Sequence, residues 1–446
     1  MNITFNERDE FKRKQIAEKA IQLLRADIDI SPMVIDGSWG TGKTEFCHKL
    51  INLMAEDETH HLIYVGAFQA DHADEPLLTV LAEVINILPS EEAQESFIQK
   101  AIPAARYGLK TLAKAGVAHL LRQDAADVVN DFDKEIQQAA NKAIDASVES
   151  VLKDHVKASE SLKALQETLQ GIAQEKPIIL FVDELDRCRP DFAVNMLEII
   201  KHTFNVEGVQ FVLVTNTQQL RSSINHCYGS SIDSQRYLDK FVKFTVNLPA
   251  FVSDGYSQTN ISLSHYRNLV AQSSSLRNKK LEQNGTIAFI EHIFSIKQTT
   301  LREIETFVRH LEIAQTLNES TFAENTIYGY QLLNILAVLL HCFEPSISKD
   351  LVNRRLDSKR LIEWFDEKPD SLNDIQTRLH PHQVILHLVC SDSPFNSDYY
   401  SPKEEKDINL LAQQVDGFFS RGWGRPDKGE SYRVVANTIN LLNFLN

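Results

Sequence analysis

The sequence predicts an α/β fold in which helices cover a parallel β-sheet, with a helical insertion and an all-α C-terminal region. Up to about residue 250, short apolar runs alternate with helical patterns, which is typical of a parallel sheet buried on both faces. Between residues 90 and 175 the strand pattern vanishes, so we expect a helical insertion there. After about residue 250 almost every pattern has helical spacing.

The predicted sheet is built from strands that alternate with helices along the chain. An amphipathic helix over residues 8–25 comes first, because its apolar residues recur at helical spacing. Further helical patterns begin at Lys43 and at Pro76. The strands are expected in five apolar runs, at 33–35, 61–68, 177–183, 209–215 and 241–248. The main C-terminal helices are expected at 261–275, 286–296, 300–317 and 328–343.

These patterns suggest one core that is interrupted once and then extended. We assign residues 1–89 and 172–250 to the α/β core and residues 90–171 to the helical insertion. Residues 251–320 form a first helical region, and residues 321–446 form a C-terminal helical region.

The composition is that of a globular, acidic protein. The chain has 446 residues, with 46 Lys and Arg against 61 Asp and Glu, which gives a formal net charge of −15. Hydrophobic residues make up 43% and charged residues 24%, which excludes wholesale disorder and a fibrous repeat. The negative charge argues against a protein that coats DNA through bulk charge.

From the sequence we predict neither a membrane-spanning helix nor a secretion signal. No stretch of about 18 uncharged apolar residues is present, and the N-terminus lacks the apolar segment of a signal peptide. The cysteines show no C-x-x-C spacing, which predicts neither a zinc site nor a disulfide framework; they are Cys47, Cys188, Cys227, Cys342 and Cys390. We therefore expect a cytoplasmic protein, because free cysteines suit a reducing compartment.

A glycine-rich loop between the first strand and the following helix fits the pattern G-x-x-x-x-G-K-[ST]. The loop consists of Gly37, Ser38, Trp39, Gly40, Thr41, Gly42, Lys43 and Thr44. Its glycines allow backbone N–H groups to surround phosphate oxygens, the lysine reaches the β- and γ-phosphates, and the threonine hydroxyl binds Mg²⁺. The alternative is a strand–helix turn without a ligand. The pattern and its context predict a P-loop NTPase fold with bound nucleotide.

A P-loop NTPase also needs an acidic residue at the end of a neighbouring strand to hold Mg²⁺, and this sequence contains such a strand. In the run Pro177–Asp183 the apolar strand ends in Asp183, whose carboxylate is expected to hold Mg²⁺. Glu184 follows, and we expect it to accept a proton from the attacking water as the general base. The alternative is an acid pair at a helix N-terminus. Asp186 and Arg187 form either a structural ion pair or a supporting group.

These motifs resemble those of the KAP family of P-loop NTPases. The loop with Trp39 inside it resembles the family's P-loop, and Asp183-Glu184-Leu185-Asp186-Arg187-Cys188 is a close variant of the family's Asp-Asp-Leu-Asp-Arg-Cys. Three supporting segments are Asp74-Glu75-Pro76-Leu77-Leu78, Tyr237-Leu238-Asp239-Lys240-Phe241 with Leu248-Pro249, and Leu301-Arg302-Glu303-Ile304-Glu305. The resemblance covers roughly residues 5–315.

The resemblance implies an ATPase of the additional-strand class, related in layout to AAA+ and STAND proteins, with ATP and Mg²⁺ as cofactors. Asn216 would then be a catalytic polar sensor that orients the attacking water, and its alternative is a helix cap. Arg302 would be a later sensor of the γ-phosphate, which makes residues 251–320 a sensor or lid region. An exposed helix arginine is the alternative.

The resemblance also implies candidates for a residue that contacts a neighbouring subunit. Arg236 and Lys240 precede the last core strand, where related ATPases carry a finger that reaches the next subunit. A solvated helix face is the alternative. A homo-oligomer therefore remains open as an assembly state.

The insertion departs from the family, in which many members carry transmembrane helices at this place. Residues 96–123 contain five basic residues and no acid. Arg106, Lys110 and Lys114 recur every four residues, so they share one helix face. This basic amphipathic stretch predicts peripheral contact with an anionic membrane or with a partner. The alternative is a helix that docks on its own bundle.

From these residues we expect an ATP-binding and ATP-hydrolysing enzyme that acts as a regulatory or assembly switch. The resemblance implies bacterial antiphage defence as one setting. Unknown protein partners would bind through the insertion or the C-terminal region. An ATP-dependent scaffold without functional turnover and a nucleic-acid-stimulated ATPase are the alternatives. None of the 15 histidines has H-E-x-x-H spacing, so no metal site is expected beyond the Mg²⁺ at Thr44 and Asp183.

Overall fold

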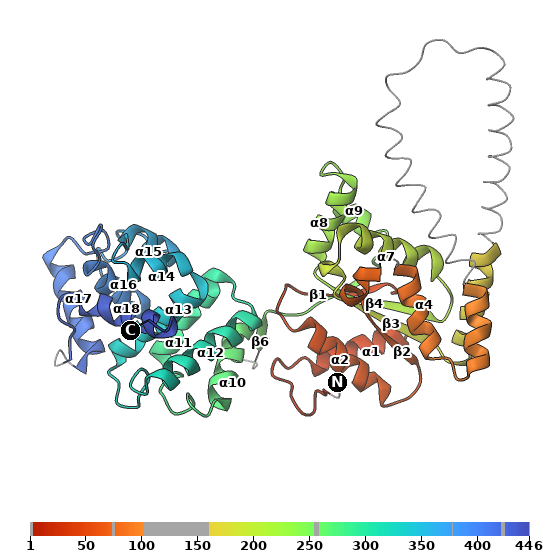
Figure 1. Ribbon diagram of the computed structural model, residues 1–446, viewed down its shortest axis with the longest axis horizontal. Coiled ribbons are helices and arrows are strands. Elements are labelled where there is room, and N and C mark those ends of the chain that lie inside the picture. Colours follow the sequence, from red (N-terminus) through yellow and green to blue (C-terminus); the bar gives the residue numbers. More distant parts are fainter. Residues whose placement is uncertain are drawn as a thin grey trace, which may run out of the picture. The chain divides into compact units, whose positions relative to one another are not determined.

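The computed structural model describes residues 3–73, 76–101, 160–253, 258–376, 378–420 and 424–445. The chain divides into two compact units, Met1–Pro249 and Ala250–Asn446, which are coloured red to green and green to blue in Figure 1. The division lies next to the end of the core expected at residue 250.

The first unit is an α/β unit around a five-stranded sheet. The sheet has the order β2-β3-β4-β1-β5, and every neighbouring pair is parallel. Its strands are β1 (Met33–Asp36), β2 (His61–Gly66), β3 (Ile178–Asp183), β4 (Val209–Thr215) and β5 (Phe244–Asn247). Because β4 lies between β1 and β3, the additional-strand layout implied by the resemblance is confirmed.

Seven helices of the first unit lie between or beside these strands along the described part of the chain. They are α1 (Lys14–Arg25), α2 (Lys43–Ala55), α3 (Ala67–Ala70), α4 (Pro76–Asn86), α7 (Pro190–Thr203), α8 (Thr217–Tyr228) and α9 (Ser234–Leu238), with short 3₁₀ turns η1 (Asp71–Ala73) and η2 (Leu185–Arg187). Residues 91–101 and 160–175 are also helical.

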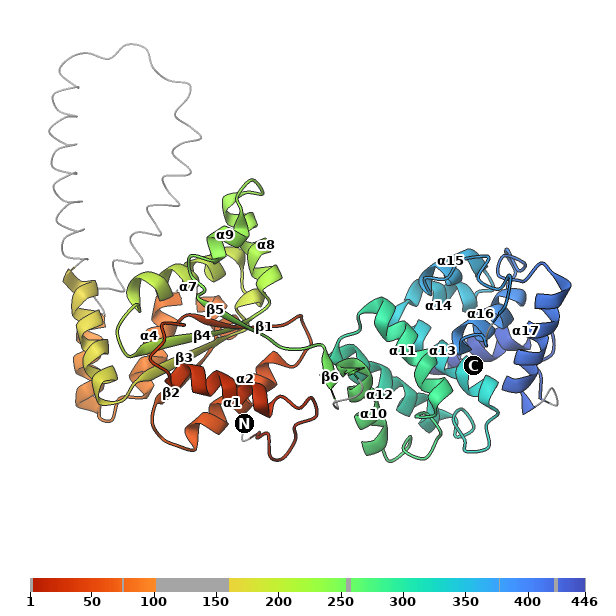
Figure 2. The ribbon, with the colours of Figure 1, turned by 180° about the vertical axis from the view of Figure 1, so that it is seen from behind.

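Both faces of the sheet are buried under helices. All six residues of β3 are buried, and its five apolar residues alternate between two apolar clusters. Phe181 packs with α1 and α2, whereas Leu180 packs with α4, α7 and α8. Figures 1 and 2 show the two helix layers on opposite faces of the strands. Two-sided burial explains why the strands read as continuous apolar runs in the sequence.

The ends of the insertion belong to the core of the first unit. Phe97, Leu165 and Leu169 are almost fully buried in the cluster that covers one face of the sheet. Residues 102–159, which include most of the basic stretch at 96–123, lie outside the described residues. The membrane-surface and partner contacts expected there therefore stay predictions.

Two element boundaries differ from the expectation. The first helix begins at Lys14 rather than at residue 8, because Lys12 has a left-handed φ of 52° and the Asp9 carboxylate accepts the N–H groups of Arg13 and Lys14. The last strand starts at Phe244, since residues before it form the end of α9 and a turn.

The described residues of the second unit form helices and one small hairpin, joined by turns and loops. Its helices are α10 (Ile261–Gln272), α11 (Asn284–Lys297), α12 (Leu301–Leu317), α13 (Tyr328–Phe343), α14 (Pro345–Val352), α15 (Ser358–Trp364), α16 (Pro381–Ser391), α17 (Glu405–Phe418) and α18 (Glu430–Leu442). The four helices predicted over 261–343 are confirmed within a few residues. None of the helices among the described residues is long and apolar enough to cross a bilayer.

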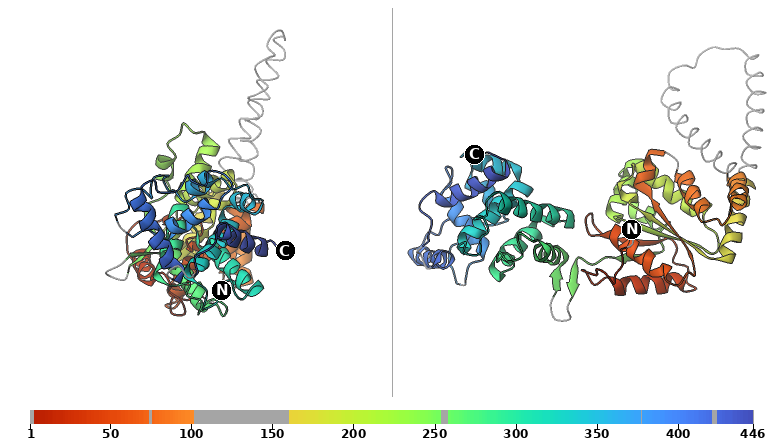
Figure 3. Two further views of the ribbon diagram at one scale, coloured as in Figure 1. Left: turned by 90° about the vertical axis from the view of Figure 1, so that its left-hand side faces the viewer. Right: turned by 60° about the horizontal axis from the view of Figure 1, so that its bottom comes forward.

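The hairpin was not predicted from the sequence. Strands β6 (Phe251–Ser253) and β7 (Gln258–Asn260) pair in antiparallel orientation at the start of the second unit, as the right-hand view of Figure 3 shows. Three residues are too few for an alternating pattern to stand out in a sequence.

Helix α13 forms the centre of the second unit. Eleven of its 16 residues are buried, and it packs against α12, α14, α16 and α18. A helix that is apolar on nearly all sides needs neighbours on all sides, which explains the bundle around it.

The core of the first unit predicts a large cost for truncating β3. Phe181 is fully buried, so Phe181→Ala should lower the free energy of unfolding of the first unit by about 3–5 kcal/mol. Phe68 on α3 is 41% exposed, and Phe68→Ala is the matched control with an expected change of at most about 1 kcal/mol. Chemical denaturation followed by circular dichroism measures both. Equal effects of the two substitutions would contradict the assigned core.

Candidate nucleotide-binding site

The site lies at the carboxyl edge of the parallel sheet. The register pairs Asp36 at the end of β1 with Thr215 at the end of β4, and it pairs Val214 with Asp183 at the end of β3. Three central strands therefore end at one level, and their polar end residues face one region. In open α/β sheets this edge is where ligands bind.

The P-loop connects β1 to α2 and has the backbone that phosphate binding requires. Gly40 and Gly42 have left-handed φ values of 71° and 80°. A Cβ atom added to Gly37 would lie 2.8 Å from Oγ1 of Thr41, so only glycine fits there. Helix α2 begins directly after Gly42, so its N-terminal N–H groups and dipole face the loop.

Lys43 is folded against the loop that carries it. Its side chain is buried, and Nζ donates hydrogen bonds to the carbonyl oxygens of Gly37 at 2.7 Å and Ser38 at 3.2 Å. Burial lowers the pKa of Lys43, and nearby carboxylates, Asp186 first, oppose that shift. A desolvated ammonium held by two weak acceptors can exchange them for phosphate oxygens.

Thr44 and Asp183 fit a magnesium site. Asp183 is 1% exposed and is hydrogen-bonded by Thr44, by the Tyr64 hydroxyl at 3.1 Å and by the N–H of Glu184 at 2.8 Å. Burial raises the pKa of Asp183, and the hydrogen bonds from Thr44 and Glu184 partly offset this. A carboxylate beside a hydroxyl is an all-oxygen donor set, which is what Mg²⁺ prefers. These residues were predicted together, and the structure brings them together.

Glu184 adopts a conformation unusual for its residue type. Its φ of 63° is left-handed, which costs a non-glycine residue about 1–2 kcal/mol. Its backbone N–H donates to the carbonyl of Val214, and its carboxylate forms an ion pair with Arg187 at 2.7 Å. Backbone strain of this kind clusters at functional sites.

Of the two alternatives for Asp186 and Arg187, an ion pair between them is not what the turn contains, because Arg187 pairs with Glu184. Residues 185–187 form a 3₁₀ turn, in which residues three apart lie on one side. Glu184 and Arg187 therefore meet, whereas adjacent residues point apart.

Asp186 instead connects three parts of the site. It is 4% exposed, and its carboxylate accepts hydrogen bonds from Nε1 of Trp39 in the P-loop and from Oγ1 of Thr215 at 3.1 Å. The P-loop, the turn after β3 and the end of β4 are thus tied to one buried carboxylate. The Trp39 ring itself remains 49% exposed.

Asn216 follows β4 and caps α8. Its Oδ1 accepts the N–H groups of Gln218 at 3.1 Å and Gln219 at 3.3 Å. It lies next to Thr215 at the same sheet edge as Asp183. The cap explains its residue type, and its role as a sensor stays a prediction.

The remaining sensor and finger candidates have local contacts that can be described within each unit. Arg302 belongs to the second unit, where it is exposed in the first turn of α12, behind a capping box of Thr300 and Glu303. In the first unit, Arg236 is 87% exposed and pairs with Asp233, and Lys240 lies over the ring of Tyr237. Their sensor and finger roles stay predictions.

Sequence reasoning missed a buried arginine that contacts the P-loop. Arg13 is 3% exposed; its guanidinium donates to the carbonyl oxygen of Thr41 at 2.7 Å and to that of Pro249 at 3.3 Å. Burial lowers the pKa of Arg13 to about 10. Its partners are far away along the chain, so no local pattern marks it.

Comparison with known proteins agrees with this geometry. The family model described as the KAP family P-loop domain matches residues 13–318. The chain belongs to the KAP family. This KAP protein is therefore a nucleotide-binding P-loop NTPase by family and by fold.

Two further comparisons were made. No curated protein matches this KAP chain. A solved structure of a DNA replication initiation factor is similar to it at 13% identity and a TM-score of 0.32, covering 100% of this chain and 98% of that chain.

The contacts of Asp186 predict weaker nucleotide binding in Asp186→Asn. An amide is neutral and has one acceptor oxygen, so this substitution would remove the negative charge near Lys43 and at least one of the two charge-assisted hydrogen bonds from Trp39 and Thr215. We expect a roughly 10-fold loss in affinity for a fluorescent ATP analogue, measured by titration.

Asp191 is exposed in the first turn of α7, and Asp191→Asn should bind like the unaltered protein. An Asp186→Asn protein that is folded and binds normally would show that this carboxylate does not organise the loop.

Proposed function

We propose that this protein hydrolyses ATP with Mg²⁺ and uses the bound state as a regulatory or assembly switch. The observation that supports this most directly is the convergence of Lys43, Thr44, Asp183 and Glu184 at one edge of the sheet. Each of these side chains corresponds to one task in phosphoryl transfer.

The tasks follow from position and chemistry. The P-loop N–H groups and Lys43 bind and orient the phosphates. The Thr44 hydroxyl and the Asp183 carboxylate hold Mg²⁺, which neutralises charge on the phosphate oxygens when it is bound. Glu184 lies one residue beyond Asp183 and accepts the proton of the attacking water.

The ion pair with Arg187 restrains this base. The pair directs Oε1 of Glu184 at the guanidinium of Arg187, 2.7 Å away, instead of at an attacking water. We infer that Arg187 must release Glu184 before water is activated. The exposed fractions of 30% for Arg187 and 18% for Glu184 leave room for that movement.

Arg13 provides a route from the P-loop to the end of the first unit. One guanidinium contacts both Thr41 in the P-loop and Pro249, the last residue of the unit. A phosphate that accepts hydrogen bonds from the P-loop N–H groups would shift the backbone at Thr41. The guanidinium of Arg13 would move with the Thr41 carbonyl and so change its hydrogen bond to Pro249. This is the support for a switch rather than for turnover alone.

The biological setting is proposed on resemblance only. Bacterial antiphage defence, protein partners, a homo-oligomeric assembly and contact with a membrane surface all stay proposals. A cytoplasmic location is proposed with them.

Steady-state ATP turnover tests the enzymatic part. Glu184→Gln should lower kcat by about 100-fold or more while ATP binding persists, because it removes only the base. Lys43→Ala should abolish binding. Glu207→Gln, an exposed glutamate beside the start of β4, is the control that should retain full turnover.

The alternatives give different results in the same assay. Turnover that never exceeds the Lys43→Ala background would reject the ATPase and favour an ATP-dependent scaffold. Turnover that rises several-fold with DNA or RNA at low salt would favour the nucleic-acid-stimulated enzyme.

Hydrogen exchange tests the role of Arg13. In the unaltered protein, ATP should change amide exchange in a peptide that covers Pro249 and β6. Arg13→Gln should remove most of that change while ATP still binds within about 10-fold of normal, because the two carbonyl contacts are lost.

Lys14 starts the same helix, and its Nζ donates to Oδ1 of Asn6 at 3.0 Å rather than to the P-loop, so Lys14→Gln is the control. A response that survives in Arg13→Gln would mean that the signal takes another route.

A further inference from the structure

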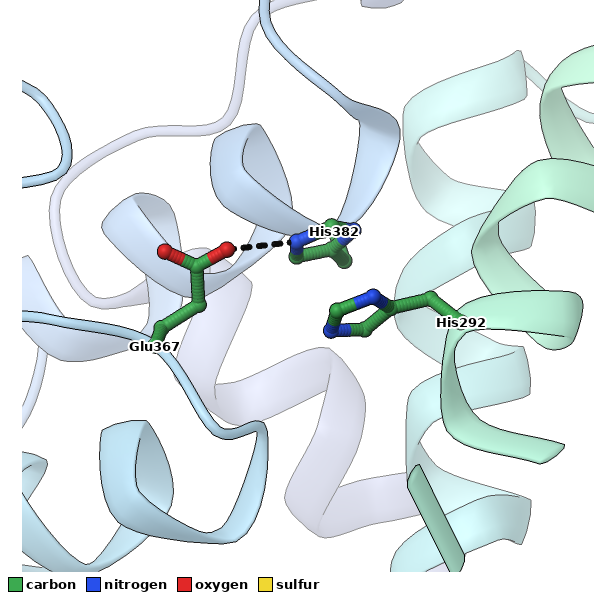
Figure 4. Close-up of side chains that lie close together, drawn as sticks. All are labelled: His292, Glu367 and His382. Atoms are coloured by element: carbon green, nitrogen blue, oxygen red, sulfur yellow. Dashed lines mark hydrogen bonds and ion pairs between the residues drawn. The ribbon is translucent and has the colours of Figure 1, made fainter. Parts of the chain in front are cut away.

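Three potential metal ligands from separate segments meet inside the second unit. His292 lies on α11, Glu367 follows α15, and His382 lies in the first turn of α16. One ligand atom from each lies within 4.8 Å of the others. Figure 4 shows the carboxylate pointing at the His382 ring, with the His292 ring on the other side. The spacing along the chain follows no motif, so the sequence alone indicated no metal site here.

His382 is the buried member of the cluster. It is 3% exposed, and its Nε2 lies 2.7 Å from Oε1 of Glu367. Among the described residues its other nitrogen, Nδ1, is buried without a hydrogen-bond partner. Burying an imidazole nitrogen without a hydrogen-bond partner costs free energy, so packing alone does not explain a histidine at this position.

The hydrogen bond of His292 fixes the tautomer that metal binding through Nδ1 requires. Its Nε2–H donates to the carbonyl oxygen of Phe365 at 3.0 Å. A carbonyl can only accept, so Nε2 carries the hydrogen and Nδ1 carries the lone pair. Histidines that bind metals typically donate their other ring N–H in this way.

The Glu367 carboxylate has outer partners too. Its Oε2 accepts a hydrogen bond from the Tyr400 hydroxyl at 3.0 Å. Its Oε1 faces Nε2 of His382 at 2.7 Å, so side chains from two other segments hold this carboxylate in place.

We propose that His292, Glu367 and His382 form a binding site for a divalent cation of the zinc type. Two imidazole nitrogens and one carboxylate oxygen suit Zn²⁺ and similar transition ions, whereas Mg²⁺ and Ca²⁺ prefer oxygen ligands alone. Three protein ligands leave a fourth position for water. The site is separate from the P-loop residues, and its existence does not depend on ATP hydrolysis.

Binding requires a limited side-chain adjustment. The two imidazole rings are stacked with centroids 3.6 Å apart and planes 7° from parallel. Lone pairs lie in the ring planes, so parallel rings cannot aim at one ion. A rotation of the half-buried His292 ring about its Cβ–Cγ bond would turn Nδ1 out of the stack and exchange the present Nε2–H bond to Phe365 for the bond to the ion, while Glu367 and His382 stay close together.

A bound ion would join elements that are otherwise held by packing. Helices α11 and α16 are in contact, and Phe365 stacks on both histidine rings. Coordination would add three bonds between α11, α16 and the segment after α15. The expected role is structural, with metal binding stabilising the second unit.

Cobalt titration of the full chain tests this proposal. The protein is stripped with a chelator, kept free of nucleotide and titrated with Co²⁺, whose visible absorption reports nitrogen and oxygen coordination. We expect one equivalent to bind and Zn²⁺ to displace it. His292→Ala, Glu367→Gln and His382→Ala should each weaken binding by about 100-fold or more.

Two control variants locate the signal. His310→Ala alters another histidine pair of the same unit, since His310 and His341 rings lie 5.2 Å apart. Lys43→Ala disables the P-loop. Both should bind Co²⁺ normally. Equal binding by the ligand variants and the controls, or no stoichiometric binding by the unaltered protein, would overturn the proposal.

A second experiment tests the site if the ligand variants fail to fold. In that case anomalous scattering from Zn²⁺ in crystals of the unaltered protein locates the ion directly. A zinc peak between the three side chains supports the site, and peaks only elsewhere reject it.

Discussion

Parallel pairing of β4 with both β1 and β3 is the constraint on which the nucleotide site depends. This pairing brings the ends of three strands to one level, where Asp36, Thr215 and Asp183 follow buried apolar runs. Any slip in register would bury these polar groups among apolar side chains. The apolar layers on both faces of the sheet therefore hold the polar site in place, although they never touch a ligand.

Buried charges connect the site to the rest of the first unit. Lys43, Asp183, Asp186 and Arg13 are each at most 9% exposed. Lys43 is held by its own loop, whereas the other three have hydrogen-bond partners from other segments. Charges in such positions are stable only with their partners in place. A change at the P-loop must consequently be accommodated at the turn after β3, at β4 and at Pro249, and this coupling is what the proposed switch would use.

In the second unit, too, apolar packing positions a polar cluster. Its apolar centre, α13, specifies the bundle, and the bundle brings His292, Glu367 and His382 together from separate segments. Polar clusters in both units thus depend on apolar packing. The P-loop cluster has a sequence motif because one turn carries most of it, while the histidine cluster has none.

The sequence alone determined the fold class, four of the C-terminal helices, the P-loop and the pairing of Thr44 with Asp183. It could do so because continuous apolar runs report two-sided burial and because the phosphate loop is a local backbone structure. Only the tertiary structure decided the contacts of Arg13 with Thr41 and Pro249, of Asp186 with Trp39 and Thr215, and of Glu184 with Arg187. The first two join segments distant along the chain, and the third depends on a 3₁₀ turn whose geometry no residue pattern specifies. Local order can be read from neighbouring residues, whereas the placement of a buried charge depends on which distant groups the fold brings within hydrogen-bond reach.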